Sequence, residues 1–111
     1  MSKQLLKKVS LFSVLTVISV MGINSSSFAA DGAALYTSKG CVACHGADGN
    51  TPMIPAYPKV AGQSKEYLIQ QMKDIKSGAR SNGQSIVMKG IMAAVSDEET
   101  SAIAEYLAGL K

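Results

Sequence analysis

The run Cys41-Val42-Ala43-Cys44-His45 restricts the fold of this chain more than any other stretch. Two thiols three positions apart, followed directly by an imidazole, allow a short helical turn to form two thioether links to a haem while the histidine coordinates the iron. The chain has no other cysteine or histidine. We therefore expect one covalent haem c on Cys41 and Cys44, with His45 as an iron ligand and the remaining residues folded around the cofactor.

Two other kinds of site use the same residue types. A structural zinc site usually takes four ligands from two separated pairs, and only carboxylates remain in this chain to complete a tetrahedron. A thioredoxin-like redox pair requires a βαβ context, which the later sequence does not offer. The motif also arises by chance in long chains. The haem interpretation therefore needs two further features in the sequence: a signal for export and a candidate for the second axial ligand.

Residues 1–29 are predicted to be a secretory signal peptide. Three lysines precede an apolar stretch at residues 9–23, and small residues follow it. This stretch of 15 residues is shorter than the roughly 20 that a membrane-spanning helix needs. Ser27 and Ala29 fit the small-x-small rule of a cleavage site. We expect a mature domain at residues 30–111, located in the periplasm and without a membrane span after cleavage.

Removal of the signal peptide leaves a chain without net charge. Three of the eleven basic residues lie in residues 1–29, so residues 30–111 carry eight basic and eight acidic side chains. Binding to nucleic acid therefore loses the support that a basic composition would give. The charges are unevenly placed, because residues 39–89 hold seven basic and three acidic side chains. We expect a positive centre and negative ends.

The mature chain is predicted to form three main helices. The first occupies residues 31–39, and the second begins at an N-cap, Ser64, and ends at Gly78. Three prolines and three glycines in residues 46–62 exclude a helix of normal length there, so this segment is predicted to be an ordered loop. Residues 85–94 are weakly patterned and contain two methionines.

The third helix has the strongest start signal. Ser96 followed by Glu99 is typical of a capping box, and the acidic residues beside it face the positive end of the helix dipole. Helical spacing predicts an apolar stripe made of Tyr67, Leu68, Met72 and Ile75, and a buried stripe made of Ile103, Tyr106, Leu107 and Leu110. No strand pattern of useful length occurs, and the fold is predicted to be all-α.

Taken together, these residues resemble the class I cytochromes c, and among them the small one-haem bacterial members and the half-units of two-haem members. The resemblance covers residues 31–110 and rests on residues 41–49, residues 57–63, Tyr67, Gln71, the segment from Lys76 to Arg80, Met88, and residues 96–106. It implies a class I cytochrome c fold, in which three main helices and loops wrap around one covalently attached haem.

The resemblance also implies roles for individual residues. His45 would bind iron on one side and a methionine sulfur on the other; the family pattern places that ligand at Met88, with Met92 as second choice and otherwise in the core beneath the haem. The carbonyl of Pro58 would accept a hydrogen bond from His45 Nδ1. Arg80 would pair with a haem propionate, unless it is an ordinary surface arginine.

With both axial positions filled by protein side chains, the iron has no open site for a substrate. The chain is therefore predicted to be a soluble one-electron carrier in a periplasmic respiratory chain and not an enzyme. Its partners would be an electron donor and an electron acceptor that dock at the positive haem edge. Two alternatives remain: a haem-based small-ligand sensor or peroxidase-like protein in which Met88 detaches, and a haem subunit of a larger oxidoreductase.

Overall fold

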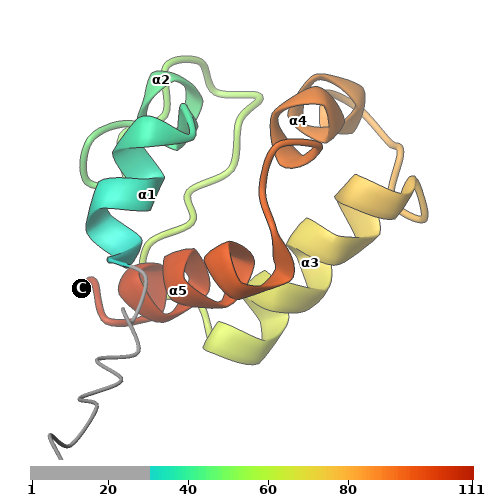
Figure 1. Cartoon of the computed structure of the whole chain (residues 1–111). Coiled ribbons are helices and arrows are strands. Elements are labelled where there is room, and N and C mark those ends of the chain that lie inside the picture. The colour runs from blue at the N-terminus through green and yellow to red at the C-terminus, as the bar shows by residue number, and fades with distance from the viewer. Residues whose placement is uncertain (1–30) are drawn as a thin grey trace, which may run out of the picture.

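The computed structural model describes residues 31–111, and within this range it contains five helices and no strand (Figure 1). The predicted all-α class is confirmed. The predicted signal peptide, residues 1–29, and Ala30 at the start of the predicted domain lie outside the described residues. Within the described part of the chain, no helix combines the length and the apolar character that crossing a membrane requires.

The first two predicted helices agree with the structure to within one residue at each end. α1 spans Gly32–Ser38, and the Asp31 carboxylate accepts hydrogen bonds from two N–H groups of its first turn, at 3.1 and 3.3 Å. α3 spans Lys65–Ser77, with the Ser64 hydroxyl as its cap and Gly78 ending it in the left-handed conformation. These caps satisfy backbone groups that have no partner inside the helix, so they can be recognised from short-range sequence.

α5, Asp97–Ala108, starts with the predicted capping box. The Ser96 N–H donates to the Glu99 carboxylate at 3.0 Å, and the Glu99 N–H donates to the Ser96 hydroxyl at 3.1 Å. The hydrogen bond from the Ser96 backbone, together with the Lys39 ammonium 3.1 Å away, holds the pKa of Glu99 below its ordinary value. The carboxylate that caps α5 is therefore also tied to the end of α1.

Two shorter helices complete the described fold. α2, Cys41–His45, is the short turn expected for the attachment motif, whereas α4, Ser85–Met92, forms where the sequence shows only a weak pattern. Gly40 turns the chain from α1 into α2 with φ 85°, a conformation that residues with a Cβ rarely adopt. α4 has no side-chain cap and contains several β-branched residues, so local signals do not mark its start.

The core lies where α1, α3 and α5 meet and extends to the end of α4. Its buried apolar side chains are Tyr36, Leu68, Met72, Ile75, Met92, Val95, Ile103, Ala104 and Leu107. Tyr106 and Leu110 are partly buried against this core, as the predicted stripe of the last helix indicated. In the predicted apolar stripe of α3, Leu68, Met72 and Ile75 are buried, whereas Tyr67 is 52% exposed and lines a cavity.

α1 crosses α5 at very short distance (Figure 1). A Cβ atom at Gly32 would lie 2.1 Å from the Ala102 carbonyl oxygen, so only glycine allows the two backbones to approach this closely. One turn later, the rings of Tyr36 and Tyr106 pack with centroids 5.8 Å apart and planes tilted by 52°. Because α2 follows α1 after only two residues, this crossing also sets the position of the attachment motif.

Candidate functional site

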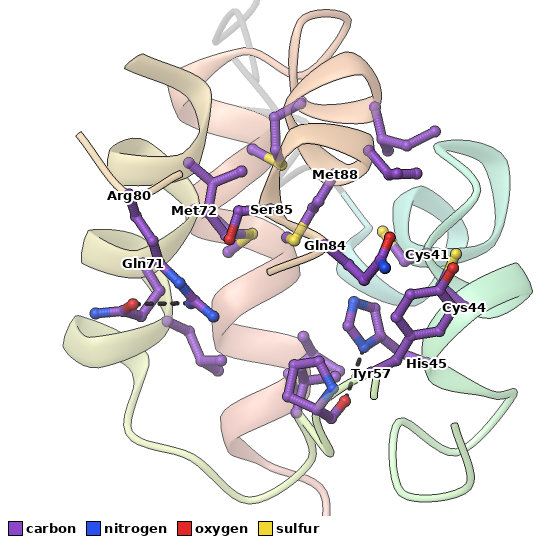
Figure 2. Close-up of a pocket in the computed structure, with 18 of the residues that line it drawn as sticks. Cys41, Cys44, His45, Tyr57, Gln71, Met72, Arg80, Gln84, Ser85 and Met88 are labelled. Atoms are coloured by element: carbon purple, nitrogen blue, oxygen red, sulfur yellow. Dashed lines mark hydrogen bonds between the residues drawn. The ribbon is translucent and has the colours of Figure 1, made fainter. Parts of the chain in front are cut away.

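All five described helices contribute side chains to one cavity of about 280 Å³ (Figure 2). Most of the lining side chains are apolar, including Ile103 and Leu107 of α5. The charged residues among them are Lys59 and Arg80, and no lining residue carries a carboxylate. The cavity therefore suits a largely apolar molecule that bears negative groups.

α2 brings all three residues of the attachment motif to this cavity. Cys41 and Cys44 are free, half-buried thiols in its lining, and His45 is 8% exposed. Burial raises the pKa of the Cys41 thiol, so the group is held in its neutral form in this apolar wall. The two cysteines and the imidazole thus face the same cavity from one short helix, as Figure 2 shows.

His45 is fixed by the loop that follows α2. Its Nδ1–H donates to the Pro58 carbonyl oxygen at 2.8 Å, the contact that the resemblance implies. The loop itself folds back on Gly49, whose carbonyl accepts hydrogen bonds from the Val60 and Ala61 N–H groups at 2.8 and 3.0 Å. With Nδ1 engaged as a donor, the lone pair of Nε2 is left free to bind a metal.

Met88 approaches the cavity from the other side, on α4. Figure 2 shows its side chain extending from α4 toward the volume that the His45 ring enters from α2. Met92, one turn later, is only 2% exposed and belongs to the buried core, although it also contributes to the lining. Met72 is buried on α3, and Met53 is 71% exposed. Met88 is thus the half-buried methionine of the cavity wall.

Arg80 lies at the polar rim of the cavity. Its Nη1 donates to the Gln71 side-chain oxygen at 2.9 Å, and both residues belong to the lining (Figure 2). The resemblance includes Gln71 but assigns it no role. Tyr67, Gln71 and Ile75 recur every four residues along α3, and this spacing would have placed Gln71 on the same face as the other lining residues.

Tyr36 has a second function besides packing, which the sequence did not reveal. Its hydroxyl donates to the Gly46 carbonyl oxygen at 2.6 Å and so ties α1 to the residue directly after His45. Burial raises the pKa of Tyr36 to about 12, so the phenol keeps its proton in the folded protein. The partner is ten residues away and a backbone group, so no side-chain pattern indicates it.

The residues of this cavity fit a haem c. Two thiols, an imidazole with a free Nε2 and a thioether sulfur lie on the walls of one apolar volume, and an arginine lies at its rim. Thiols form the thioether links, imidazole and thioether are haem iron ligands, and the planar guanidinium matches a carboxylate. The described residues contain no group of three or more histidine, cysteine, aspartate or glutamate side chains that could hold a metal ion by themselves.

Comparisons with known proteins agree with this reading of the site. Residues 29–111 match the protein family described as Cytochrome c. Cytochrome c4 of Pseudomonas aeruginosa is 40% identical over 100 residues, which cover 88% of this chain and 48% of that protein. Cytochrome c-553 of Nitratidesulfovibrio vulgaris is 40% identical over 86 residues, which cover 78% of this chain and 82% of that protein.

The fold is similar to that of a solved structure as well. The crystal structure of reduced recombinant cytochrome c4 from Pseudomonas stutzeri superimposes with a TM-score of 0.65 and 29% sequence identity, covering 77% of this chain and 49% of that one. The chain spans about half the length of the cytochromes c4 that it matches.

Proposed function

Because this chain belongs to the cytochrome c family of electron carriers, whose cofactor is a covalently bound haem c, we propose that it is a soluble one-electron carrier of a periplasmic respiratory chain. The observation that carries this proposal is the position of two side chains. His45 and Met88 enter the same cavity from α2 and α4, which flank it. Export to the periplasm rests on the predicted signal peptide at residues 1–29.

Each residue of the site would have a defined task. Cys41 and Cys44 would attach the cofactor, and His45 and Met88 would bind its iron from opposite sides. The haem supplies reversible one-electron oxidation and reduction, and a thioether ligand together with an apolar pocket favours the reduced state. The Pro58 carbonyl holds the His45 ring in one tautomer and orientation, so the ring needs little rearrangement between oxidation states.

This arrangement supports electron transfer rather than catalysis. Two protein ligands would occupy both axial positions of the iron, so no position remains where a substrate could bind. The chain would therefore exchange electrons with partner proteins without chemically changing them.

The surface near the cavity mouth supports docking of those partners. Val87 and Ile91 of α4 line the cavity, yet they are 50% and 40% exposed, and the neighbouring Ile86 is 74% exposed. Lys59 and Arg80 add positive charge to the lining. We expect donor and acceptor proteins to present an apolar contact with an acidic rim, and transfer rates should fall as salt rises. Transfer rates that do not change with salt would contradict the proposed electrostatic attraction between this surface and its partners.

The ligand assignment is tested by the visible spectrum of the ferric holoprotein. A sulfur-to-iron bond gives a weak absorption band near the red end of the spectrum. We expect Met88→Ala to lose this band and Met92→Ala to keep it. The reverse result would show that Met92 is the ligand. Binding of CO by the wild-type ferrous protein would favour the alternative, a ligand-binding haem protein with a detachable methionine.

A further inference from the structure

The helix that carries Met88 is attached to the rest of the protein at few places. Among the described helices, the backbone of α4 lies next to α3 and next to no other helix. Figure 1 shows α4 apart from α1 and α2, with one segment of chain leading from it to α5. This segment, residues 93–96, is the linker. The position of Met88 therefore depends on α3, on the buried Met92, and on the two chain segments that join α4 to α3 and to α5.

Two lysines from different helices bind the linker. Lys39, the C-cap residue of α1, donates from Nζ to the Ala94 carbonyl oxygen at 2.9 Å. Lys76, in the last turn of α3, donates from Nζ to the Val95 carbonyl oxygen. Val95 itself is 1% exposed and packs in the core. Lys39 and Lys76, with the two carbonyl groups that they bind, are called here the lysine clamp.

The clamp connects the two sides of the cavity. Lys39 lies two residues before Cys41, so it joins the start of the attachment helix to the end of the methionine helix. Its Nζ also lies 3.1 Å from the Glu99 carboxylate, which caps α5 and prevents Lys39 from turning away. Hydrogen bonds from ammonium groups are stronger than neutral ones. Two consecutive carbonyls are thus fixed, and the linker cannot shift without breaking at least one of these bonds.

We propose that Lys39 and Lys76 are positioning residues for Met88. By fixing residues 94 and 95 relative to α1 and α3, they would hold α4 where the Met88 sulfur can bind the haem iron, while Ile86, Val87 and Ile91 of the same helix stay exposed to partners. The inference rests on the proposed role of Met88 as axial ligand. It assigns a function to two lysines that would otherwise count as part of a general positive surface.

Displacement of Met88 by an added ligand tests the clamp. Imidazole can bind the ferric iron only when Met88 leaves, so its affinity for the holoprotein measures how easily α4 moves away. We expect Lys76→Gln to raise the imidazole affinity about tenfold, which corresponds to about 1.4 kcal/mol. Lys76→Arg should restore the wild-type affinity, because a guanidinium group can still donate to the Val95 carbonyl.

Lys65→Gln is the matched control. Lys65 also lies on α3, and its variant loses the same charge, but its partner is Glu105 at 3.5 Å in an exposed pair away from the linker. The control should bind imidazole like the wild type. Lys39→Gln removes the other half of the clamp and should raise the affinity as Lys76→Gln does, which gives a second, independent test.

The outcomes separate the clamp from the ligand assignment. If Met88→Ala keeps the sulfur-to-iron band, Met88 is not the ligand, and the proposed function is wrong in its assignment of the second iron ligand. If Met88→Ala loses the band, but Lys76→Gln and Lys39→Gln bind imidazole no more tightly than Lys65→Gln, the clamp proposal is wrong and the ligand assignment stands.

Discussion

The close crossing of α1 and α5 makes Gly32→Ala a severe test of the fold. A Cβ atom at Gly32 would lie 2.1 Å from the Ala102 carbonyl oxygen and 2.7 Å from Tyr106 Cβ. Carbon and oxygen atoms approach without clash only to about 3.3 Å, so the helices would have to separate by roughly 1 Å. Neither obstacle is the end of a flexible side chain, so rotation of a side chain cannot relieve the clash.

The loss in free energy of unfolding can be approximated from the side chains that are buried at the crossing of α1 and α5. Tyr36 and Ile103 are each 1% exposed and Ala104 is fully buried, so a gap between the helices weakens contacts at the centre of the core. A gap of 0.5–1 Å forfeits about a quarter to a half of the dispersion energy of each contact. Overpacking costs about 3 kcal/mol at the upper end of its usual range, and the better helix propensity of alanine offsets about 1 kcal/mol. We expect a net loss of about 2 kcal/mol.

Gly90→Ala provides the control on the same protein. Gly90 lies within α4, and a Cβ atom there would meet no heavy atom within 4 Å. Alanine at this position should increase the free energy of unfolding by about 0.5–1 kcal/mol, because glycine loses more backbone entropy in a helix. Urea unfolding of the two holoprotein variants, followed by circular dichroism, measures both effects. A Gly32→Ala variant as stable as the wild type would refute the argument from the crossing.

Three further predictions concern the site and its supports. Tyr36→Phe should lower the free energy of unfolding by about 1 kcal/mol at neutral pH, because the hydrogen bond to Gly46 is lost. Burial raises the Tyr36 pKa from about 10 to about 12, so the stability of the wild type should fall as pH rises between these values, and urea unfolding should show a smaller fall in the variant. The pKa of Glu99 is lowered, so its contribution to stability is present above its ordinary pKa of about 4.3 and is lost as pH falls. Glu99→Gln should therefore lose less stability on acidification than the wild type does, and an equal loss would show that the Glu99 carboxylate does not stabilise the start of α5. Arg80→Gln should lower the reduction potential in a redox titration, because a positive charge beside the cofactor favours the reduced state; an unchanged potential would show that Arg80 does not act on it.

The sequence predicted those parts of the fold that short-range chemistry decides. Asp31, Ser64 and Ser96 each cap a helix through hydrogen bonds that reach two or three residues along the chain. α4 was not predicted as a helix, because Gln84 provides no side-chain cap and packing on α3 stabilises the segment instead. Tertiary contacts, and not propensity, decide its conformation.

The same division applies to the site. The haem-attachment residues could be predicted from spacing alone, whereas Pro58 and Met88 came from the resemblance to a family. Lys39 and Lys76 could not be found in either way. Their partners are backbone carbonyls 55 and 19 residues away, and a carbonyl has the same chemistry at every position of the sequence.

The central claim is that His45 and Met88 enclose a haem that carries one electron. A redox titration of the holoprotein beside its Met88→His variant tests it most directly. We predict a single one-electron transition in both proteins, with a higher potential in the wild type because a thioether favours the ferrous state more than a second imidazole does. Equal potentials in the two proteins would contradict the claim, because they would show that Met88 does not bind the iron.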